Sequence, residues 1–154
     1  MSYQERKSIT NIISSIIITT IYAIIMYQKY SSGAIDDSNL FIFWAIVILI
    51  FIPISIIARI IILIIYHILE SIVSVAQGNE PEDAIDIMDE RDKLIEMKST
   101  AISMYIFSLS FVIGLVTQLF DLSGHVFFVV LIIGGFLSDM VSEMLKIRFY
   151  RRGV

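Results

Sequence analysis

Residues 40–69 have the sequence LFIFWAIVILIFIPISIIARIIILIIYHIL, an apolar run of about thirty residues in which Arg59 is the one formally charged side chain. A run this long and this poor in charge is typical of a transmembrane helix, which needs about 20 apolar residues to cross a hydrocarbon core roughly 30 Å thick. As a helix the run would be about 45 Å long, so it has to tilt, bend or project from the membrane. Pro53 removes one backbone hydrogen bond and predicts a bend. We expect the helix to continue past Glu70 and to end before Gly78.

Three further apolar runs, at about 9–27, 99–120 and 126–147, accompany this one. The sequence therefore predicts an all-α fold, a bundle of four transmembrane helices in a single domain, 1–154. A hydrophobic content of 57% and a mean hydropathy of +0.85 agree, because both lie outside the range of ordinary soluble domains. The first run is longer than the apolar region of about 7 to 15 residues in a signal peptide, so we expect it to be a retained span.

Lysine and arginine gather at one end of the predicted bundle. They precede the first run, lie between the second and third, and follow the fourth: Arg6, Lys7, Arg91, Lys93, Lys98, Lys146, Arg148, Arg151 and Arg152. The opposite loops carry only Lys29, at one margin. Because basic residues beside spans stay on the cytoplasmic side, we expect a multi-pass protein of the cytoplasmic (inner) cell membrane. Both termini and a helical hairpin at about 70–98 should then lie in the cytoplasm.

Composition and motifs argue against several classes of function. The formal net charge of −4, with basic residues confined to span ends, makes nucleic acid an improbable partner. Cysteine is absent, which removes disulfides, thiolate nucleophiles and cysteine-based metal sites. The sequence holds no nucleophile elbow, HExxH or glycine-rich phosphate loop. It therefore predicts a protein that is not an enzyme and that needs no cofactor.

The segment before the third run is the one strongly charged part of the chain. Its sequence Asp89-Glu90-Arg91-Asp92, followed by Ile95, Lys98 and an apolar run, resembles the DERD-x-x-I-x-x-K stretch of small, mostly uncharacterised prokaryotic four-helix membrane proteins. The resemblance implies the same four-span topology with a charged hairpin facing the cytoplasm, and it carries over no activity. Two interpretations remain: a solvated connector that continues as a helix into the third span, or a docking surface for a cytoplasmic protein formed by Asp89, Glu90, Arg91, Asp92 and Lys98.

Small and polar residues predict which helix faces pack together, because helices in lipid associate through close backbone approach and interhelical hydrogen bonds. The fourth run has a small residue at every fourth position, and the third has a comparable stripe that includes Gly114. The residues of the fourth run are Gly134, Ser138 and Ser142. On the first run a stripe of Ser8, Asn11, Ser15, Thr19 and Tyr22 should face protein. These faces can be satisfied within one chain or between the copies of a homodimer.

Three charged residues fall inside the apolar runs. Arg59 and Asp139 share a depth, and Glu143 lies one helical turn from Asp139. A charge at mid-membrane costs at least about 2.5 to 3.5 kcal/mol, so such groups usually face a partner or water. One interpretation is a structural Arg59–Asp139 ion pair, or an arginine that snorkels to the headgroups. The other is a water-accessible transport site in which Asp139 or Glu143 changes protonation.

The two histidines suggest little chemistry. His67 and Glu70 form an i, i+3 pair that could approach Glu143, and imidazole with carboxylate from facing helices is used by metal sites in bundles. Such sites collect more ligands than this chain offers, so a hydrogen-bonded interfacial histidine is favoured. His125 follows Asp121 in a short loop and is predicted to be a solvated turn residue.

Two functions fit these features. The favoured one is a non-catalytic integral membrane protein that acts through self-association or by binding a membrane or cytoplasmic partner. The alternative is a small oligomeric transporter or channel subunit that uses Asp139 and Glu143 with Arg59. Burial discriminates between them: a cavity open to one side and lined by these charges favours transport, and charges sealed in packing favour the structural role.

Overall fold

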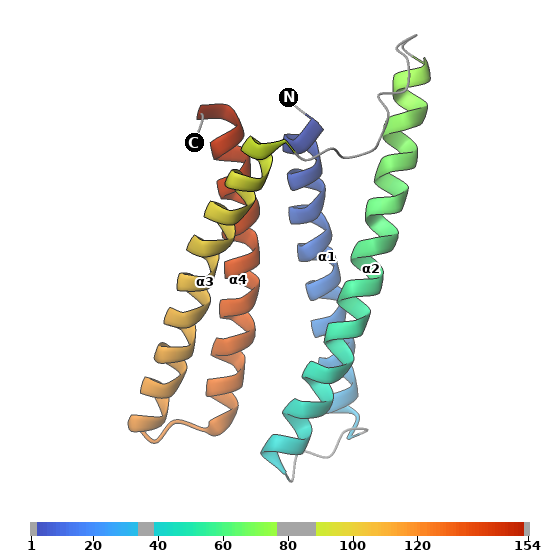
Figure 1. Cartoon of the computed structure of the whole chain (residues 1–154). Helices are drawn as coiled ribbons and strands as arrows, with labels where there is room; N and C mark the ends of the chain where they lie inside the picture. The colour runs from blue at the N-terminus through green and yellow to red at the C-terminus, as the bar shows by residue number, and fades with distance from the viewer. Residues whose placement is uncertain (1–2, 34–38, 77–88, 153–154) are drawn as a thin grey trace.

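The computed structural model describes residues 3–33, 39–76 and 89–152, and four long helices account for nearly all of them (Figure 1). Each helix is long and apolar enough to cross a membrane, as expected for a multi-pass membrane protein. The prediction of an all-α fold with four candidate spans is therefore confirmed. The helices are α1 (Tyr3–Ser31), α2 (Leu40–Ala76), α3 (Glu90–Leu119) and α4 (Gly124–Arg152).

The helices extend beyond the apolar runs that predicted them, because polar residues continue each helix past the hydrocarbon. α3 begins nine residues before the predicted span, and Asp89 is its N-cap, with a carboxylate that accepts a hydrogen bond from the backbone N–H of Glu90 at 2.7 Å. The charged segment thus feeds into the third span as a helix from Glu90 onward. The rest of the predicted hairpin, 77–88, lies outside the described residues. Pro53 lies inside α2 and does not end it.

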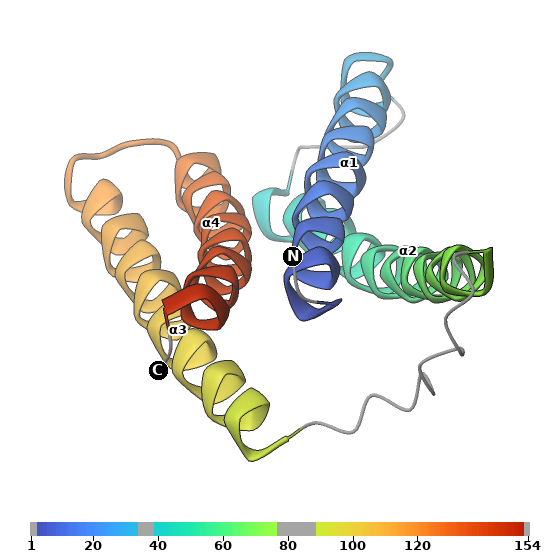
Figure 2. The ribbon, with the colours of Figure 1, turned by 90° about the horizontal axis from the view of Figure 1, so that it is seen from above.

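The helices form an open row rather than a closed ring. α3 and α4 pack closely as an antiparallel hairpin, α1 packs on α4, and α2 packs on α1 with a few contacts to α4. Within the described ranges α3 touches α4 but neither α1 nor α2. Figure 2 shows α3 and α4 on one side of the molecule and α1 and α2 on the other. Both chain termini lie at the same end, called the terminal end below; the opposite end is the far end (Figure 1).

Small residues bring α3 and α4 together. A Cβ atom added to Gly134 would lie 2.2 Å from both Cβ and Oγ of Ser110, so the two backbones approach as closely as a glycine allows. One turn away, the Ser138 hydroxyl donates a hydrogen bond across the interface to the backbone carbonyl of Ser103 at 2.6 Å. Gly114 lies against the ring of Phe127. Ser142 is also buried.

An aromatic cluster holds the far end together. Tyr22 of α1 and Phe43, Trp44 and Val47 of α2 are its buried members, and the Tyr22 hydroxyl donates a hydrogen bond to the backbone carbonyl of Val47. The Trp44 indole N–H donates to Nδ1 of His125 at 3.1 Å. The prediction that His125 is a solvated turn residue is therefore wrong: it lies half-buried in the first turn of α4, because Trp44 and Phe43 pack against it.

Elsewhere α2 exposes its apolar side chains. Its most apolar stretch has no buried residue. Exposed isoleucines on every side of a helix are unfavourable in water but suit hydrocarbon, which surrounds them without the cost of ordering solvent. The second helix is therefore held to the others mainly at its far-end aromatic residues and at a few polar contacts.

Candidate functional site

Polar side chains form a continuous line between α1, α4 and α2, from the terminal end to about the middle of the bundle. We call this line the polar seam. On both α1 and α4 its members recur about once per helical turn, so they lie along one face of each helix. These two faces contact each other. They are Glu5, Asn11 and Ser15 of α1, Arg59 of α2, and Asp139, Glu143, Lys146 and Arg151 of α4.

The deepest part of the seam joins three helices. Arg59 of α2 binds the carboxylate of Asp139 through both terminal nitrogens, with Nη2–Oδ2 at 2.8 Å and Nη1–Oδ1 at 3.3 Å. Ser15 of α1 donates its hydroxyl to the same Oδ2 at 2.8 Å, and its oxygen accepts from Arg59 Nη2 at 3.4 Å. Paired charges with parallel N–H···O bonds are the strong form of this contact. The pair neutralises both charges and ties α1, α2 and α4 at one depth.

Glu143 lies one turn closer to the terminal end and is more deeply buried. Its Oε1 accepts hydrogen bonds from Lys146 at 2.9 Å and from the Asn11 amide at 3.3 Å. Its Oε2 is buried and has no hydrogen-bond partner among the described residues. Burying a carboxylate oxygen without a hydrogen-bond donor costs free energy. Oε2 of Glu143 is the one buried acceptor of the seam in this state among the described residues.

The last turns of the seam meet the polar start of α1. Arg151 donates to Glu5 at 3.3 Å. The pair His67 and Glu70 does not turn toward Glu143 as the sequence suggested. The Tyr3 hydroxyl lies 2.8 Å from Nδ1 of His67, and Arg6 forms an ion pair with Glu70.

These contacts weigh against a metal site at the terminal end. His67 and Glu70 are engaged by tyrosine and arginine, and arginine is a donor that cannot ligate a metal. Within residues 3–33, 39–76 and 89–152 there is no group of three or more histidine, aspartate or glutamate side chains that could hold an ion. The hydrogen-bonded interfacial histidine is therefore the role that the geometry supports for His67.

Exposure separates the two carboxylates. The side chain of Glu143 is 8% exposed, whereas those of Arg59 and Asp139 are 37% and 33% exposed. Asp139 lies nine residues from Arg148 along α4, or about 13 Å, which places it well inside the hydrocarbon if Arg148 lies at the headgroups. The Arg59–Asp139 pair is thus one-third uncovered between helices that are long and apolar enough to span a membrane.

Arg59 also keeps unused hydrogen-bonding capacity. A guanidinium has five N–H donors, and those of Arg59 that bond within the described chain are on Nη1 and Nη2. Its Nε–H makes no hydrogen bond to any described residue. Arg59 therefore has N–H donors that no described residue accepts.

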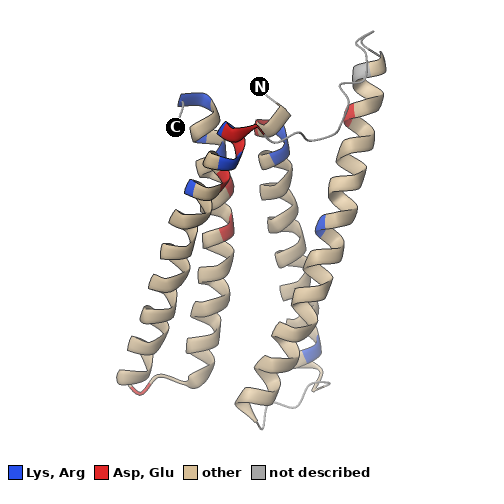
Figure 3. Cartoon of the chain, viewed as in Figure 1, with Lys and Arg blue, Asp and Glu red and all other residues tan. Residues whose placement is uncertain are grey.

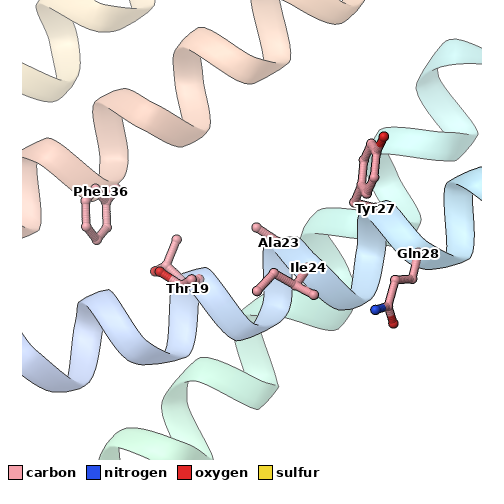
Figure 4. Close-up of a pocket in the computed structure, with 7 residues that line it drawn as sticks. Thr19, Ala23, Ile24, Tyr27, Gln28 and Phe136 are labelled. Carbon is pink, nitrogen blue, oxygen red and sulfur yellow. The ribbon is translucent and has the colours of Figure 1, made fainter.

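A shallow, open groove of about 600 Å³ lies along the far half of α1, with Phe136 as the one α4 residue that lines it. Figure 4 shows Thr19 on α1 and Phe136 on α4 pointing toward each other at its inner end. The lining residues are Thr19, Thr20, Ala23, Ile24, Tyr27, Gln28 and Phe136. Arg59, Asp139 and Glu143 do not line it, so the groove does not supply the charged cavity that transport was predicted to require.

The proposed docking residues lie at the start of α3 (Figure 3). Asp89, Glu90, Arg91 and Lys98 are exposed, and Asp92 is half-buried on the side that leads to Ile95. Ile95 and Ser99 are fully buried against α4. The charged side chains therefore remain on the solvent side of a helix that is anchored by its apolar and small residues.

Sequence reasoning did not assign partners to Asn11 and Ser15. Both were placed on a stripe that should face protein, but the pairing of Asn11 with Glu143 and of Ser15 with Asp139 was not predicted. The signal was present: polar residues at three- and four-residue spacing on α1 match charged residues at the same spacing on α4. The stripe also includes Ser8 and Tyr22, which are buried.

Comparison of the chain with protein-family models, with curated proteins and with solved structures finds no match. The functional argument therefore rests on the geometry of the chain itself.

Proposed function

We propose that this chain is a non-catalytic integral membrane protein that acts by associating with another membrane protein, in the first place with a second copy of itself. The observation that carries the proposal is the Arg59–Asp139 pair, which is one-third exposed between helices that are long and apolar enough to span a membrane. Exposed apolar side chains suit lipid, but an exposed ion pair with unused donors does not. A helix packed over the pair, offering hydrogen-bond acceptors, would remove this cost.

The surface for such a helix would follow the edge of α2 that carries Arg59. Ile52 and Ile56 lie two turns and one turn before Arg59 on the same side of the helix, and they are 47% and 54% exposed. Because Ile52 and Ile56 are about half exposed and Arg59 is more than one-third exposed, the described helices leave this edge open. A two-fold dimer would place the Arg59–Asp139 pair of one copy beside that of the other, so that each Asp139 carboxylate could accept from the unused Arg59 donors of the second copy.

Cross-linking tests self-association directly, since the chain has no cysteine of its own. Ile56→Cys should give a disulfide-linked dimer on mild oxidation in native membranes, because the symmetric contact would bring the two thiols together. Leu109→Cys is the matched control: Leu109 is 59% exposed but lies on α3, away from this edge. Equal and low cross-linking of the two variants would refute association through α2.

We further propose that the terminal end of the bundle faces the cytoplasm and that the protein resides in the cytoplasmic membrane. In support, lysine and arginine cluster at that end (Figure 3), and Lys29 is the one basic residue at the far end in the described ranges. The proposal places both termini and the start of α3 in the cytoplasm, where a cytoplasmic protein can dock on Asp89, Glu90, Arg91, Asp92 and Lys98.

Thiol labelling checks this orientation. In intact cells a membrane-impermeant maleimide should label Ser123→Cys, in the exposed turn before α4, without permeabilisation. Met97→Cys, 70% exposed at the opposite end of α3, should react only after the membrane is opened. The reverse pattern would place the termini outside.

One observation favours transport as a second candidate function. The buried Oε2 of Glu143 lacks a partner among the described residues and offers an acceptor to a passing proton donor or cation. Liposome flux that depends on Glu143 separates the two candidates. If transport is the function, the wild-type chain gives a flux of protons or cations into liposomes, and Glu143→Gln abolishes it. If association is the function, neither the wild-type chain nor the variant gives a flux, and the Ile56→Cys cross-link persists.

A further inference from the structure

A hydrogen bond between a tryptophan and a histidine joins the first turns of α2 and α4, which both lie at the far end of the bundle (Figure 1). The Trp44 indole N–H donates to Nδ1 of His125 at 3.1 Å. An indole nitrogen can only donate, so Nδ1 has to accept with its lone pair. The imidazole in this contact is therefore neutral and carries its proton on Nε2.

Protonation of His125 would remove this acceptor. An imidazolium carries a hydrogen on both ring nitrogens and accepts no hydrogen bond. Two N–H groups would then face each other across 3.1 Å. Trp44, which is only 9% exposed, would also lose the acceptor of its N–H. Since an imidazole ordinarily changes charge between about pH 5 and 8, mild acid would break the contact.

The described neighbours offer an imidazolium at His125 no opposite charge. The aromatic residues of α2 that pack against its ring carry none. The next titratable side chain along α2 is Arg59, along α4 it is Asp139, and α3 has none after Tyr105. The loop residues 34–38 lie outside the described residues. The other described titratable side chains of the far end make no hydrogen bond or ion pair with His125; they are Tyr22, Tyr27, Lys29, Tyr30 and Asp121.

The contact matters because little else holds α2 to α4. At the far end Trp44 stacks on Phe128 of α4, with ring centroids 5.4 Å apart. Leu40 lies so close to Gly124 that a Cβ added to the glycine would clash with it. Further along, the most apolar stretch of α2 buries no residue. Displacement of the Trp44 indole would therefore loosen the whole far end of α2 from α4.

We propose that Trp44 and His125 form a pH-sensitive clasp, which is closed while the imidazole is neutral and opens when it is protonated, so that the far end of α2 parts from α4. α2 stays on α1, because the hydrogen bond from Tyr22 to the Val47 carbonyl involves no imidazole. The clasp does not depend on self-association through the α2 edge. It responds to the pH on whichever side of the membrane the far end faces.

Spin labels on pairs of cysteines measure the opening in the purified full chain, which has no cysteine of its own. The first pair is Ile42→Cys on α2 with Val129→Cys on α4, both at exposed positions. The distance between its labels should lengthen by several ångströms from about pH 8 to about pH 5 and should recover on return. The control pair, Leu119→Cys with Val129→Cys, lies within the α3–α4 hairpin, so its distance should stay constant.

Three variants of the labelled chain identify the group that responds. His125→Asn places an uncharged amide oxygen near the position of Nδ1, so the clasp should stay closed at both pH values. His67→Asn makes the same change in the other histidine of the chain and should open as the wild type does. Trp44→Phe keeps an aromatic ring in the stack but removes the donor, so the distance should no longer depend on pH. This variant decides the matter if His125→Asn fails to fold.

The clasp is disproved by any of three results. In the first, the distance between the labels on α2 and α4 is the same at both pH values in the wild-type chain. In the second, His125→Asn or Trp44→Phe opens with acid as the wild type does. In the third, His67→Asn abolishes the response, which would assign the titration to the opposite end of the bundle.

Discussion

Arg59→Leu is expected to lower the free energy of unfolding in detergent by about 2 to 4 kcal/mol. The substitution leaves the Asp139 carboxylate with Ser15 as its sole remaining hydrogen-bond donor among the described residues, at a depth where a lone charge is poorly solvated. Breaking a fully buried pair costs about 3 to 5 kcal/mol, and the one-third exposure of this pair reduces that figure. Denaturation monitored by fluorescence of Trp44, the one tryptophan in the chain, measures the change.

The double variant Arg59→Leu with Asp139→Leu should recover much of this loss, since removing both charges removes the uncompensated carboxylate. Such a double-mutant cycle isolates the coupling between the two side chains. Lys29→Leu is the control for loss of a positive charge that forms no ion pair with any described residue, and it should change the stability little. Losses that simply add for the two single variants would show that the pair contributes no coupling energy.

Gly134→Ala is expected to destabilise the α3–α4 hairpin by about 1 to 3 kcal/mol, the usual cost of overpacking a close contact. The added methyl would lie 2.2 Å from the Cβ and Oγ of Ser110, so one helix has to move away from the other. Gly134→Leu should have a larger effect and separate the hairpin. Thermal unfolding in detergent, with the mass of the particle recorded alongside, measures both.

The next residue provides a matched control. A Cβ on Gly135 would meet only the Phe107 ring, at 3.8 Å, so Gly135→Ala should be neutral or stabilising by up to about 1 kcal/mol through helix propensity. Adding Ser110→Gly to Gly134→Ala should recover part of the lost stability, because it removes the atoms that clash but places a glycine inside α3. If Gly134→Ala were as well tolerated as Gly135→Ala, the close approach of α3 and α4 at this point would be disproved.

Much of the fold was predictable because lipid imposes a simple rule on sequence. A run such as 40–69 has to be helical in hydrocarbon, where every backbone polar group needs an internal partner. The same rule made Arg59 and Asp139 conspicuous, since two opposite charges at one depth have reason to meet. The spacing of Gly134, Ser138 and Ser142 likewise pointed to a packing face. The helix ends were less predictable, because the polar turns outside the hydrocarbon, such as 90–98, carry no hydropathy signal.

The sequence by itself thus determined the number of candidate spans, the packing faces and the charges that require partners, and the tertiary structure decided which faces meet. Periodicity places Asn11 and Ser15 on one side of a helix but cannot specify a partner more than a hundred positions away, such as Glu143 or Asp139. Only the packed structure shows that α1 supplies those partners and that Tyr3 engages His67. The physical reason is that a hydrocarbon surrounding requires each helix to be apolar on its own. Which side chains of two helices pair depends instead on the shape of the helices and on the hydrogen bonds between them.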